Sequence, residues 1–280
     1  MNHLGNENSF SFQRTIHALN EGLKLIIRGG CKMSRIKILM IVVSGLFMMI
    51  GIITMVSAGA EAAPLNEASV PAFYQDIIQV ENPDSLSVLV NKNYSLPEDY
   101  EPDDLVFLEV PLYNNDKNNE ANYLRKEAAD ALKELFTAAK KEGYELIARS
   151  GYRSYATQAS LYERYVEQDG VEAADTYSAR PGHSEHQTGL TIDVTSDTVH
   201  GGLTELFGET EEGKWVAENA YRFGFIVRYP QDRTAETGYQ YEPWHLRYVG
   251  VQAATEIYQD QLILEDYVLS VMNRTSFLWD

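Results

Sequence analysis

The sequence predicts an α+β domain in which helices flank a small mixed or antiparallel sheet. Helical periodicity is concentrated in the early and late parts of the region after residue 85, and short apolar runs typical of strands lie between them. A long uncharged apolar run near the N-terminus stands apart from this pattern. We therefore expect one folded domain, preceded by a single transmembrane or signal segment.

Several segments carry helical signals. Between about residues 120 and 142, apolar side chains recur every three or four positions, and Gly143 follows where a C-cap glycine is expected. A second helix should run from the loop at 151–155 to about residue 168. Residues 211–223 have the same periodicity, and the chain should close helically from residue 251 to about 271.

Strands are predicted where short apolar and β-branched runs are bounded by turn formers. These runs lie at residues 145–150, 188–194, 225–229 and 245–249. Because they fall between the helical segments, we expect them to form the sheet that carries any functional site.

The apolar run at residues 38–56 is long enough to cross a membrane. At about 1.5 Å per residue, a helix of this length approaches the roughly 30 Å hydrocarbon core. Lys32, Arg35 and Lys37 precede the run, so the positive-inside rule keeps the N-terminus cytoplasmic and translocates the rest.

Two export routes fit this segment. The small residues 57–60 would suit signal cleavage, and Met33 could be an alternative start, but the run exceeds the usual length of a cleaved signal. We expect a single-pass membrane protein with an extracytoplasmic domain, or else secretion after cleavage.

The predicted organisation has five parts. They are a basic cytoplasmic N-terminus at 1–37, an anchor or signal at 38–58, a linker or stalk at 59–84, the catalytic domain at 85–272 and a C-terminal tail at 273–280.

Charge excludes one class of partner. The formal net charge is −18, although residues 1–63 are net basic, so the domain itself is strongly acidic. A domain of that charge repels phosphates, which excludes nucleic acid as a partner. The acidity otherwise indicates a soluble surface.

The only cysteine, Cys31, precedes the apolar run, so the domain contains no thiol. Disulfides, cysteine-bound zinc and thiol nucleophiles are therefore excluded from it. Of the six histidines, His3 and His17 fall on the cytoplasmic side. The histidines left for an exported metal site are His183, His186, His200 and His245.

Two motifs carry the candidate chemistry. In Ser184-Glu-His-Gln-Thr-Gly-Leu-Thr-Ile-Asp193, His186 lies in a loop and Asp193 in the strand that follows, and Gly189 lets the chain turn between them. The second motif, Glu242-Pro-Trp-His245, precedes the last predicted strand. If these two strands pair, His245 would lie beside Asp193.

This residue set has the composition of a hydrolytic zinc site. Such a site needs three His or carboxylate ligands with one open position, and a carboxylate outside the ligand set that takes a proton from water. We predict that one Zn²⁺ is held by His186, Asp193 and His245, with Glu242 as the catalytic base. Trp244 would wall the site and lower its dielectric.

The motifs resemble those of the VanY-type D-alanyl-D-alanine carboxypeptidases, which are zinc peptidoglycan metallopeptidases. The resemblance covers about residues 85–272, including Asn91-Lys92, Leu96-Pro97 and Ser150-Gly-Tyr-Arg-Ser154. It implies the same ligands and base at these positions. It also implies removal of the C-terminal D-alanine from a peptidoglycan stem peptide or its lipid-linked precursor.

The resemblance also suggests substrate contacts. Arg153 matches a family arginine, which would stabilise an oxyanion or clamp a terminal carboxylate. Ser184 and Gln158 match positions that look like substrate contacts, although Gln158 could instead face solvent on its helix. His183 is expected to line the substrate groove or to pack, rather than to bind metal.

Two alternatives remain open. Similar sequences are L,D-carboxypeptidases that act on tetrapeptide stems, so the bond cleaved is not fixed. A non-catalytic peptidoglycan-binding protein on the same scaffold is disfavoured, because the three ligands and the base are all present.

Overall fold

The computed structural model describes residues 73–276, which all belong to one compact unit, Ala68–Asp280. The apolar run at 38–56, and with it the predictions on anchoring, cleavage and start site, lies outside the described residues. Among residues 73–276, no helix is both long and apolar enough to cross a membrane.

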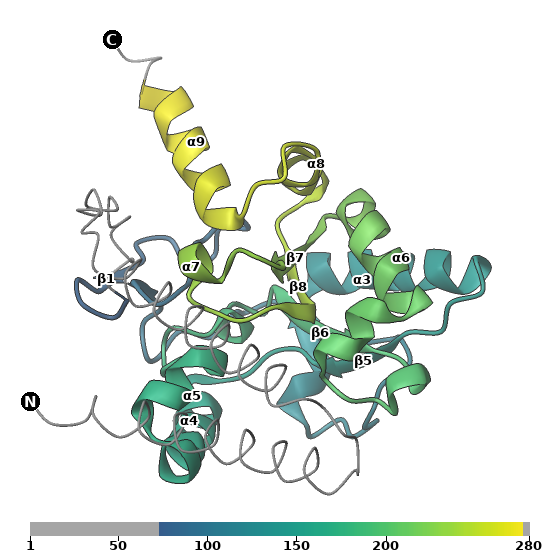
Figure 1. The fold of residues 1–280 in the computed structure, drawn as a ribbon, viewed down its shortest axis with the longest axis horizontal. Coiled ribbons are helices and arrows are strands. Elements are labelled where there is room, and N and C mark those ends of the chain that lie inside the picture. The colour runs from purple at the N-terminus through teal and green to yellow at the C-terminus, as the bar shows by residue number, and fades with distance from the viewer. Residues whose placement is uncertain (1–72, 277–280) are drawn as a thin grey trace, which may run out of the picture. The chain divides into compact units, whose positions relative to one another are not determined.

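A four-stranded antiparallel sheet forms the centre of the domain (Figure 1). Its order is β5 (Ile147–Ser150), β6 (Thr191–Thr195), β8 (Glu242–Tyr248) and β7 (Phe225–Tyr229). The strands of the two motifs pair with each other in the β6–β8 ladder, which was the condition for placing His245 beside Asp193. The α+β class with an antiparallel sheet and flanking helices is also confirmed.

Two short ladders lie outside this sheet. The strands β1 (Ile78–Gln79) and β2 (Tyr94–Ser95) pair in parallel. The strands β3 (Leu105–Phe107) and β4 (Tyr123–Arg125) pair antiparallel.

One face of the central sheet carries the apolar core. Side chains alternate along β6, so Ile192 and Val194 lie on the core side and Asp193 on the other. Helix α3 (Lys126–Lys141) packs Leu132 and Leu135 into the same core, and α6 (Glu211–Asn219) adds Trp215. The polar face of β6 is thereby left for the site.

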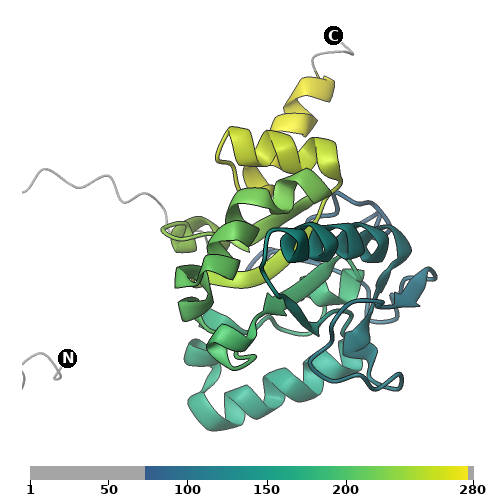
Figure 2. The ribbon, with the colours of Figure 1, turned by 90° about the vertical axis from the view of Figure 1, so that its right-hand side faces the viewer.

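Helices α4 (Tyr155–Asp169) and α5 (Val171–Tyr177) pack against each other on the opposite side of the sheet (Figure 1). In Figures 1 and 2, α3 and α4 lie on opposite sides of the sheet. The other α-helices of the described residues are α7 (Thr234–Thr237), α8 (Val251–Gln259) and α9 (Leu264–Ser276). The 3-10 turns are η1 (Glu120–Asn122), η2 (Glu185–Thr188), η3 (Asp197–Val199), η4 (Glu205–Glu209) and η5 (Ala220–Phe223).

The predicted helix at 120–142 begins too early. Residues 120–122 form η1 and residues 123–125 form β4, so α3 begins only at Lys126. The backbone groups of β4 pair with β3 and are not free to begin a helix. The predicted closing helix is likewise two helices, which are separated at Gln261 where φ is 53°.

Both ends of the predicted domain extend further than expected. Residues 73–84, assigned to the stalk, belong to the folded unit, because β1 pairs with β2 and Val80 packs against the core. At the other end, α9 continues past residue 272 to Ser276, so half of the predicted tail is helical.

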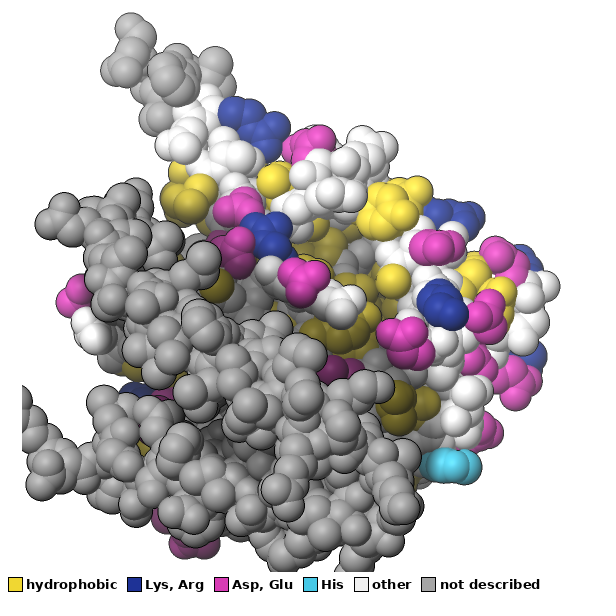
Figure 3. All heavy atoms as spheres, viewed as in Figure 1, with side chains coloured by type: hydrophobic (Ala, Val, Ile, Leu, Met, Phe, Trp, Pro, Cys, Tyr) yellow, Lys and Arg dark blue, Asp and Glu magenta, His cyan; other side chains and the backbone are white. Residues whose placement is uncertain are grey.

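Acidic and basic side chains are interspersed on the exposed face seen in Figure 3. Asp and Glu are spread over the surface near α3 and α6 with Lys and Arg among them. On this face the acidity is distributed, as expected for surface charge that keeps a protein soluble.

Candidate metal centre

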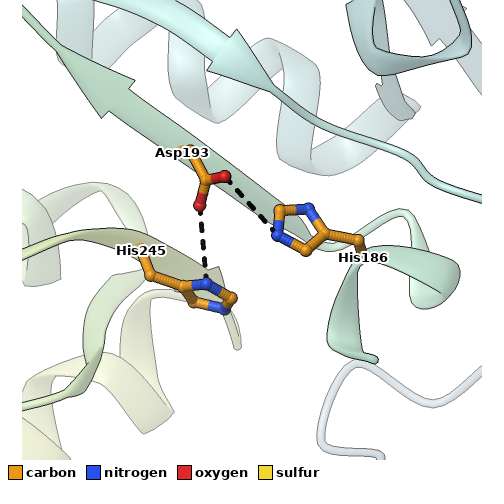
Figure 4. Close-up of side chains that lie close together, drawn as sticks. All are labelled: His186, Asp193 and His245. Carbon is orange, nitrogen blue, oxygen red and sulfur yellow. Dashed lines mark ion pairs between the residues drawn. The ribbon is translucent and has the colours of Figure 1, made fainter. Parts of the chain in front are cut away.

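Asp193 and His245 lie opposite each other in the β6–β8 ladder. Residues directly opposite in an antiparallel pair project from the same face of the sheet. Their side chains therefore meet on the polar face, where Oδ1 of Asp193 lies 3.4 Å from Nδ1 of His245. Figure 4 shows both side chains pointing into the same space.

His186 approaches from the turn η2, which precedes β6. Gly189 ends this turn at a φ of 65°, a left-handed conformation that favours glycine. The Nδ1–H of His186 donates to the carbonyl of Gly151 at 2.7 Å, so Nε2 keeps its lone pair. That Nε2 lies 3.6 Å from Oδ2 of Asp193.

These three side chains fit a zinc ion. Their ligand atoms all lie within 4.8 Å of one another. Nδ1 of His245 lies 3.4 Å from Oδ1 of Asp193, and Nε2 of His186 lies 3.6 Å from Oδ2 of the same carboxylate. Both distances are close to the edge of about 3.4 Å in a tetrahedron with bonds of roughly 2.0–2.1 Å. Oδ1 of Asp193 is buried and has no hydrogen-bond partner among residues 73–276, as expected of an atom that binds a metal.

The buried surroundings shift the pKa values of all three side chains. Burial, together with the guanidinium of Arg153, lowers the pKa of His186 well below its ordinary value and keeps the ring neutral. Burial raises the pKa of Asp193 to about 6. For His245 burial opposes the charge, but the carboxylates of Glu185 and Glu242 prevail and raise its pKa to about 9. A cation bound here would replace that proton.

Glu242 reaches the same space because β8 is irregular. Val227 pairs with Leu246 and Tyr229 with Glu242, so one residue of β7 faces three residues of β8. Residues three apart in a regular strand project from opposite faces. The irregularity turns the side chain of Glu242 to the same face as His245, as bulges near active sites do. Oε2 of Glu242 therefore lies 3.4 Å from Nδ1 of His245. The sequence placed Glu242 before the strand, but it is the first strand residue.

Arg153 lines the cavity beside these residues. Its Nη1 donates to Oε1 of Gln158 at 2.8 Å, and its Nη2 donates to Oγ of Ser150 at 3.0 Å. Its backbone N–H also donates to the carbonyl of His186 at 3.2 Å. The guanidinium is therefore held in one place at the wall of the site.

Gln158 and His183, two of the predicted substrate contacts, are not among the residues that line the cavity. Gln158 is only 1% exposed and bridges Arg153 to the carbonyl of Ala179, so it neither faces solvent nor lines the cavity. His183 packs edge-on against Tyr74, and its Nδ1–H donates to the carbonyl of Asn91 at 2.8 Å. The structure thus supports packing for His183 and a holding role for Gln158.

Ser184 does line the cavity, which has a volume of about 320 Å³. Much of the remaining wall is aromatic, because five large rings surround the polar cluster. They belong to Tyr165, Tyr177, Tyr229, Tyr239 and Trp244.

Sequence reasoning missed Glu185 as a site residue. It lines the cavity and is 1% exposed, between Ser184 and His186 in the first motif. Burial alone would raise its pKa, but the guanidiniums of Arg228 and Arg247 hold that pKa well below its usual range. The position of this carboxylate next to the predicted ligand His186 could have identified Glu185 from the sequence. Its arginine partners could not, because they lie on strands far away along the chain.

Comparison with known proteins agrees with this geometry. A family model described as VanY, D-alanyl-D-alanine carboxypeptidase, matches residues 121–251. The Bacillus subtilis (strain 168) protein YodJ is 51% identical over 188 residues, which cover 67% of this chain and 68% of YodJ. The chain belongs to the VanY family.

Solved structures of the VanY family share the fold. The LdcB LD-carboxypeptidase is 50% identical with a TM-score of 0.67, and the match covers 69% of this chain and 89% of LdcB. A VanY D,D-pentapeptidase from a VanB-type resistance cassette, solved in complex with Zn(II), is 37% identical with a TM-score of 0.52. That match covers 65% of this chain and 98% of the pentapeptidase.

Proposed function

We propose that this protein is a zinc-dependent carboxypeptidase that removes the C-terminal D-alanine from peptidoglycan stem peptides. One observation carries the proposal: three metal-ligand atoms lie within 4.8 Å of one another in a buried site, beside a carboxylate that is not needed as a ligand. Membership of the VanY family supports both the metal and the substrate class.

His186, Asp193 and His245 would hold the zinc ion. Bound there, zinc would act as a Lewis acid toward the scissile carbonyl and lower the pKa of water. Glu242 takes a proton from the attacking water and then gives it to the leaving amine of D-alanine.

Arg153 has a separate task in this proposal. Its guanidinium is fixed by Gln158 and Ser150 at the cavity wall. It would stabilise the negative oxygen that develops at the scissile carbonyl, or clamp the terminal carboxylate of the substrate. Its fixed orientation favours either task, because little reorganisation is needed when charge develops.

The bond cleaved is either the D,D bond of a pentapeptide or the L,D bond of a tetrapeptide. The D,D-pentapeptidase, at 37% identity, supports the first. The LD-carboxypeptidase, at 50% identity, favours the second, and we therefore retain it as an alternative. Both reactions release D-alanine, so the general proposal does not depend on the choice.

Peptidoglycan lies outside the cell membrane, and so must the active site in this proposal. The apolar run at 38–56 provides an anchor or an export signal for the domain. The substrate would be the stem peptide of the wall or its lipid-linked precursor.

The test is release of D-alanine by the purified domain from pentapeptide and tetrapeptide stems, with and without a chelator, identified by mass. We expect release from at least one stem, loss of release with the chelator and recovery on adding zinc. The peptide that is cleaved decides between the D,D and L,D reactions. No chelator-sensitive release from either stem would contradict the proposal.

A further inference from the structure

A buried carboxylate lies directly behind His245, on the side away from Asp193. Oε1 of Glu185 accepts from Nε of Arg228 and from Nη1 of Arg247, both at 2.8 Å. Its other oxygen, Oε2, is buried and has no hydrogen-bond partner in the described part of the chain. This Oε2 lies 3.6 Å from Nε2 of His245, which is also buried without a partner.

The two nitrogens of His245 thus face different carboxylates. Nδ1 lies toward Asp193 and Glu242, where the metal would bind. A histidine that binds a metal through Nδ1 carries its proton on Nε2, and an acceptor there fixes both the tautomer and the ring orientation. Glu185 Oε2 is the acceptor that stands in that position.

The arginines explain why Glu185 stays behind His245. They occupy Oε1 and leave only Oε2 for the histidine. Arg247 is fixed in turn by donating to the backbone carbonyls of Leu86 and Val88 at 3.0 and 2.8 Å. Moving the carboxylate toward the metal side would break both of these ion pairs between buried side chains, which is costly.

The network continues to the C-terminal helix. Nη1 and Nη2 of Arg228 donate to the two oxygens of Glu265, the second residue of α9, at 2.9 and 2.7 Å. Asn91 donates to the same carboxylate at 3.0 Å. Leu264, next to Glu265, is buried in an apolar cluster with Ile226 of β7. Helix α9 lies beyond residue 251, where the match to the VanY family model ends.

We propose that Glu185 is a positioning residue for His245, and that Glu265 of α9 holds it in place through Arg228. The proposal rests on the proposed zinc site. It assigns a role to α9, because Glu265 of this helix completes the bidentate contact that orients Arg228. Zinc affinity, rather than substrate binding, is the property these residues set.

The test measures zinc dissociation constants by competition with a chromophoric chelator for the full folded domain. Glu185→Gln places an amide where the acceptor should be, and we expect zinc to bind about 10–100-fold more weakly. Glu265→Gln keeps hydrogen-bonding atoms but loses the charge, and we expect a smaller weakening. Asp104→Asn is the matched control, since it removes a carboxylate from the Arg125 ion pair, and should leave zinc affinity unchanged.

A second readout separates positioning from a general structural role. Cobalt replaces zinc, and its visible absorption reports the geometry of the ligands. We expect Glu185→Gln and Glu265→Gln to shift this spectrum, whereas Asp104→Asn should reproduce the wild-type spectrum. If Glu185→Gln does not fold, Glu265→Gln decides the matter by the same two measurements.

The outcomes distinguish the two proposals. A wild-type protein that binds no zinc refutes the proposed zinc site itself. A wild-type protein that binds zinc, with unchanged affinity and cobalt spectrum in every folded variant of Glu185 and Glu265, overturns only the positioning network. Weakened binding with a shifted spectrum in these variants but not in Asp104→Asn supports it.

Discussion

Two buried clusters of charged side chains lie next to each other in this protein, and the ion-pair distances within them differ. In the metal cluster, the ion-pair separations between His186, Asp193, His245 and Glu242 are 3.4 to 3.6 Å. In the arginine cluster, the separations between Glu185, Arg228, Arg247 and Glu265 are 2.7 to 2.9 Å. Charge-assisted hydrogen bonds have the shorter length, whereas the longer one leaves room for a bound ion.

This difference in distance distinguishes side chains that bind a metal from side chains that hold other residues in place. Asp193 has a buried oxygen with no hydrogen-bond partner in the part of the chain that the structure describes, as expected of a ligand atom in the absence of its metal. Arg228 has partners at Nε, Nη1 and Nη2, as a residue that fixes others does. Glu185 and His245 are the contact between the two clusters.

The largest expected effect is on catalysis by the metal cluster. Glu242→Ala should lower kcat by about 10²–10⁴-fold, because the general base is removed while the three ligands stay. Turnover and zinc content are measured on the same sample. Full zinc content with near-normal hydrolysis would remove Glu242 from its role, and loss of zinc would make it a ligand instead.

The arginine cluster should matter more for folding. Arg228→Met leaves two buried or half-buried carboxylates without their main partner, so the free energy of unfolding should fall by about 3–5 kcal/mol. Urea denaturation of the metal-free protein measures this. A change below about 1 kcal/mol, the range of surface ion pairs, would contradict the claim that the arginine cluster stabilises the fold.

Lys92 is a buried charge outside both clusters and should give a pH-dependent stability. It is 4% exposed, its Nζ donates to the carbonyls of Asp175 and Gly238 at 2.5 Å, and burial lowers its pKa to about 8. The unfolded chain, with a lysine pKa of about 10.4, binds more protons between these values.

This contribution to stability should therefore rise with pH, by about 2–3 kcal/mol between roughly pH 8 and 10.4. Lys92→Met removes this pH-dependent contribution. The difference in unfolding free energy between wild type and variant therefore separates the titration of Lys92 from that of nearby tyrosines. Unfolding free energies at pH 7.5 and 10 provide the measurement. Parallel pH profiles for the two proteins would show that Lys92 keeps an ordinary pKa.

The smallest effect is expected at the surface. Lys126 and Asp130 form an ion pair of 2.7 Å, as short as those of the arginine cluster, but both side chains are 66% exposed. Asp130→Asn should change the free energy of unfolding by less than about 1 kcal/mol, since water screens the pair. A cost close to that of Arg228→Met would mean that distance, rather than burial, sets the strength of these pairs.

Local patterns in the sequence predicted much of this architecture. The strand expected at 225–229 is β7, Phe225–Tyr229, and the expected helix after the 151–155 loop is α4, capped by Ser154. The two motifs located His186, Asp193 and His245, which the fold brings together. These features depend on periodicity, capping and turn residues, and these signals come from residues that are close together in the sequence.

Features that depend on distant pairing could not be predicted in this way. Whether residues 123–125 continue a helix or form β4 depends on the presence of β3. The irregularity in β8 that brings Glu242 to His245 exists only in its pairing with β7. Glu185 contacts Arg228 and Arg247 because three separate segments of the chain come together. No short-range pattern in the sequence predicts this contact.

The central claim is that the metal cluster binds one zinc ion through His186, Asp193 and His245. Anomalous diffraction at the zinc absorption edge, from crystals of the zinc-loaded domain, tests this claim most directly. We predict a single peak within about 2.0–2.2 Å of Nε2 of His186, Nδ1 of His245 and an oxygen of Asp193, with Glu242 outside the ligand sphere. A peak elsewhere, or none in a protein that releases D-alanine, would contradict the account.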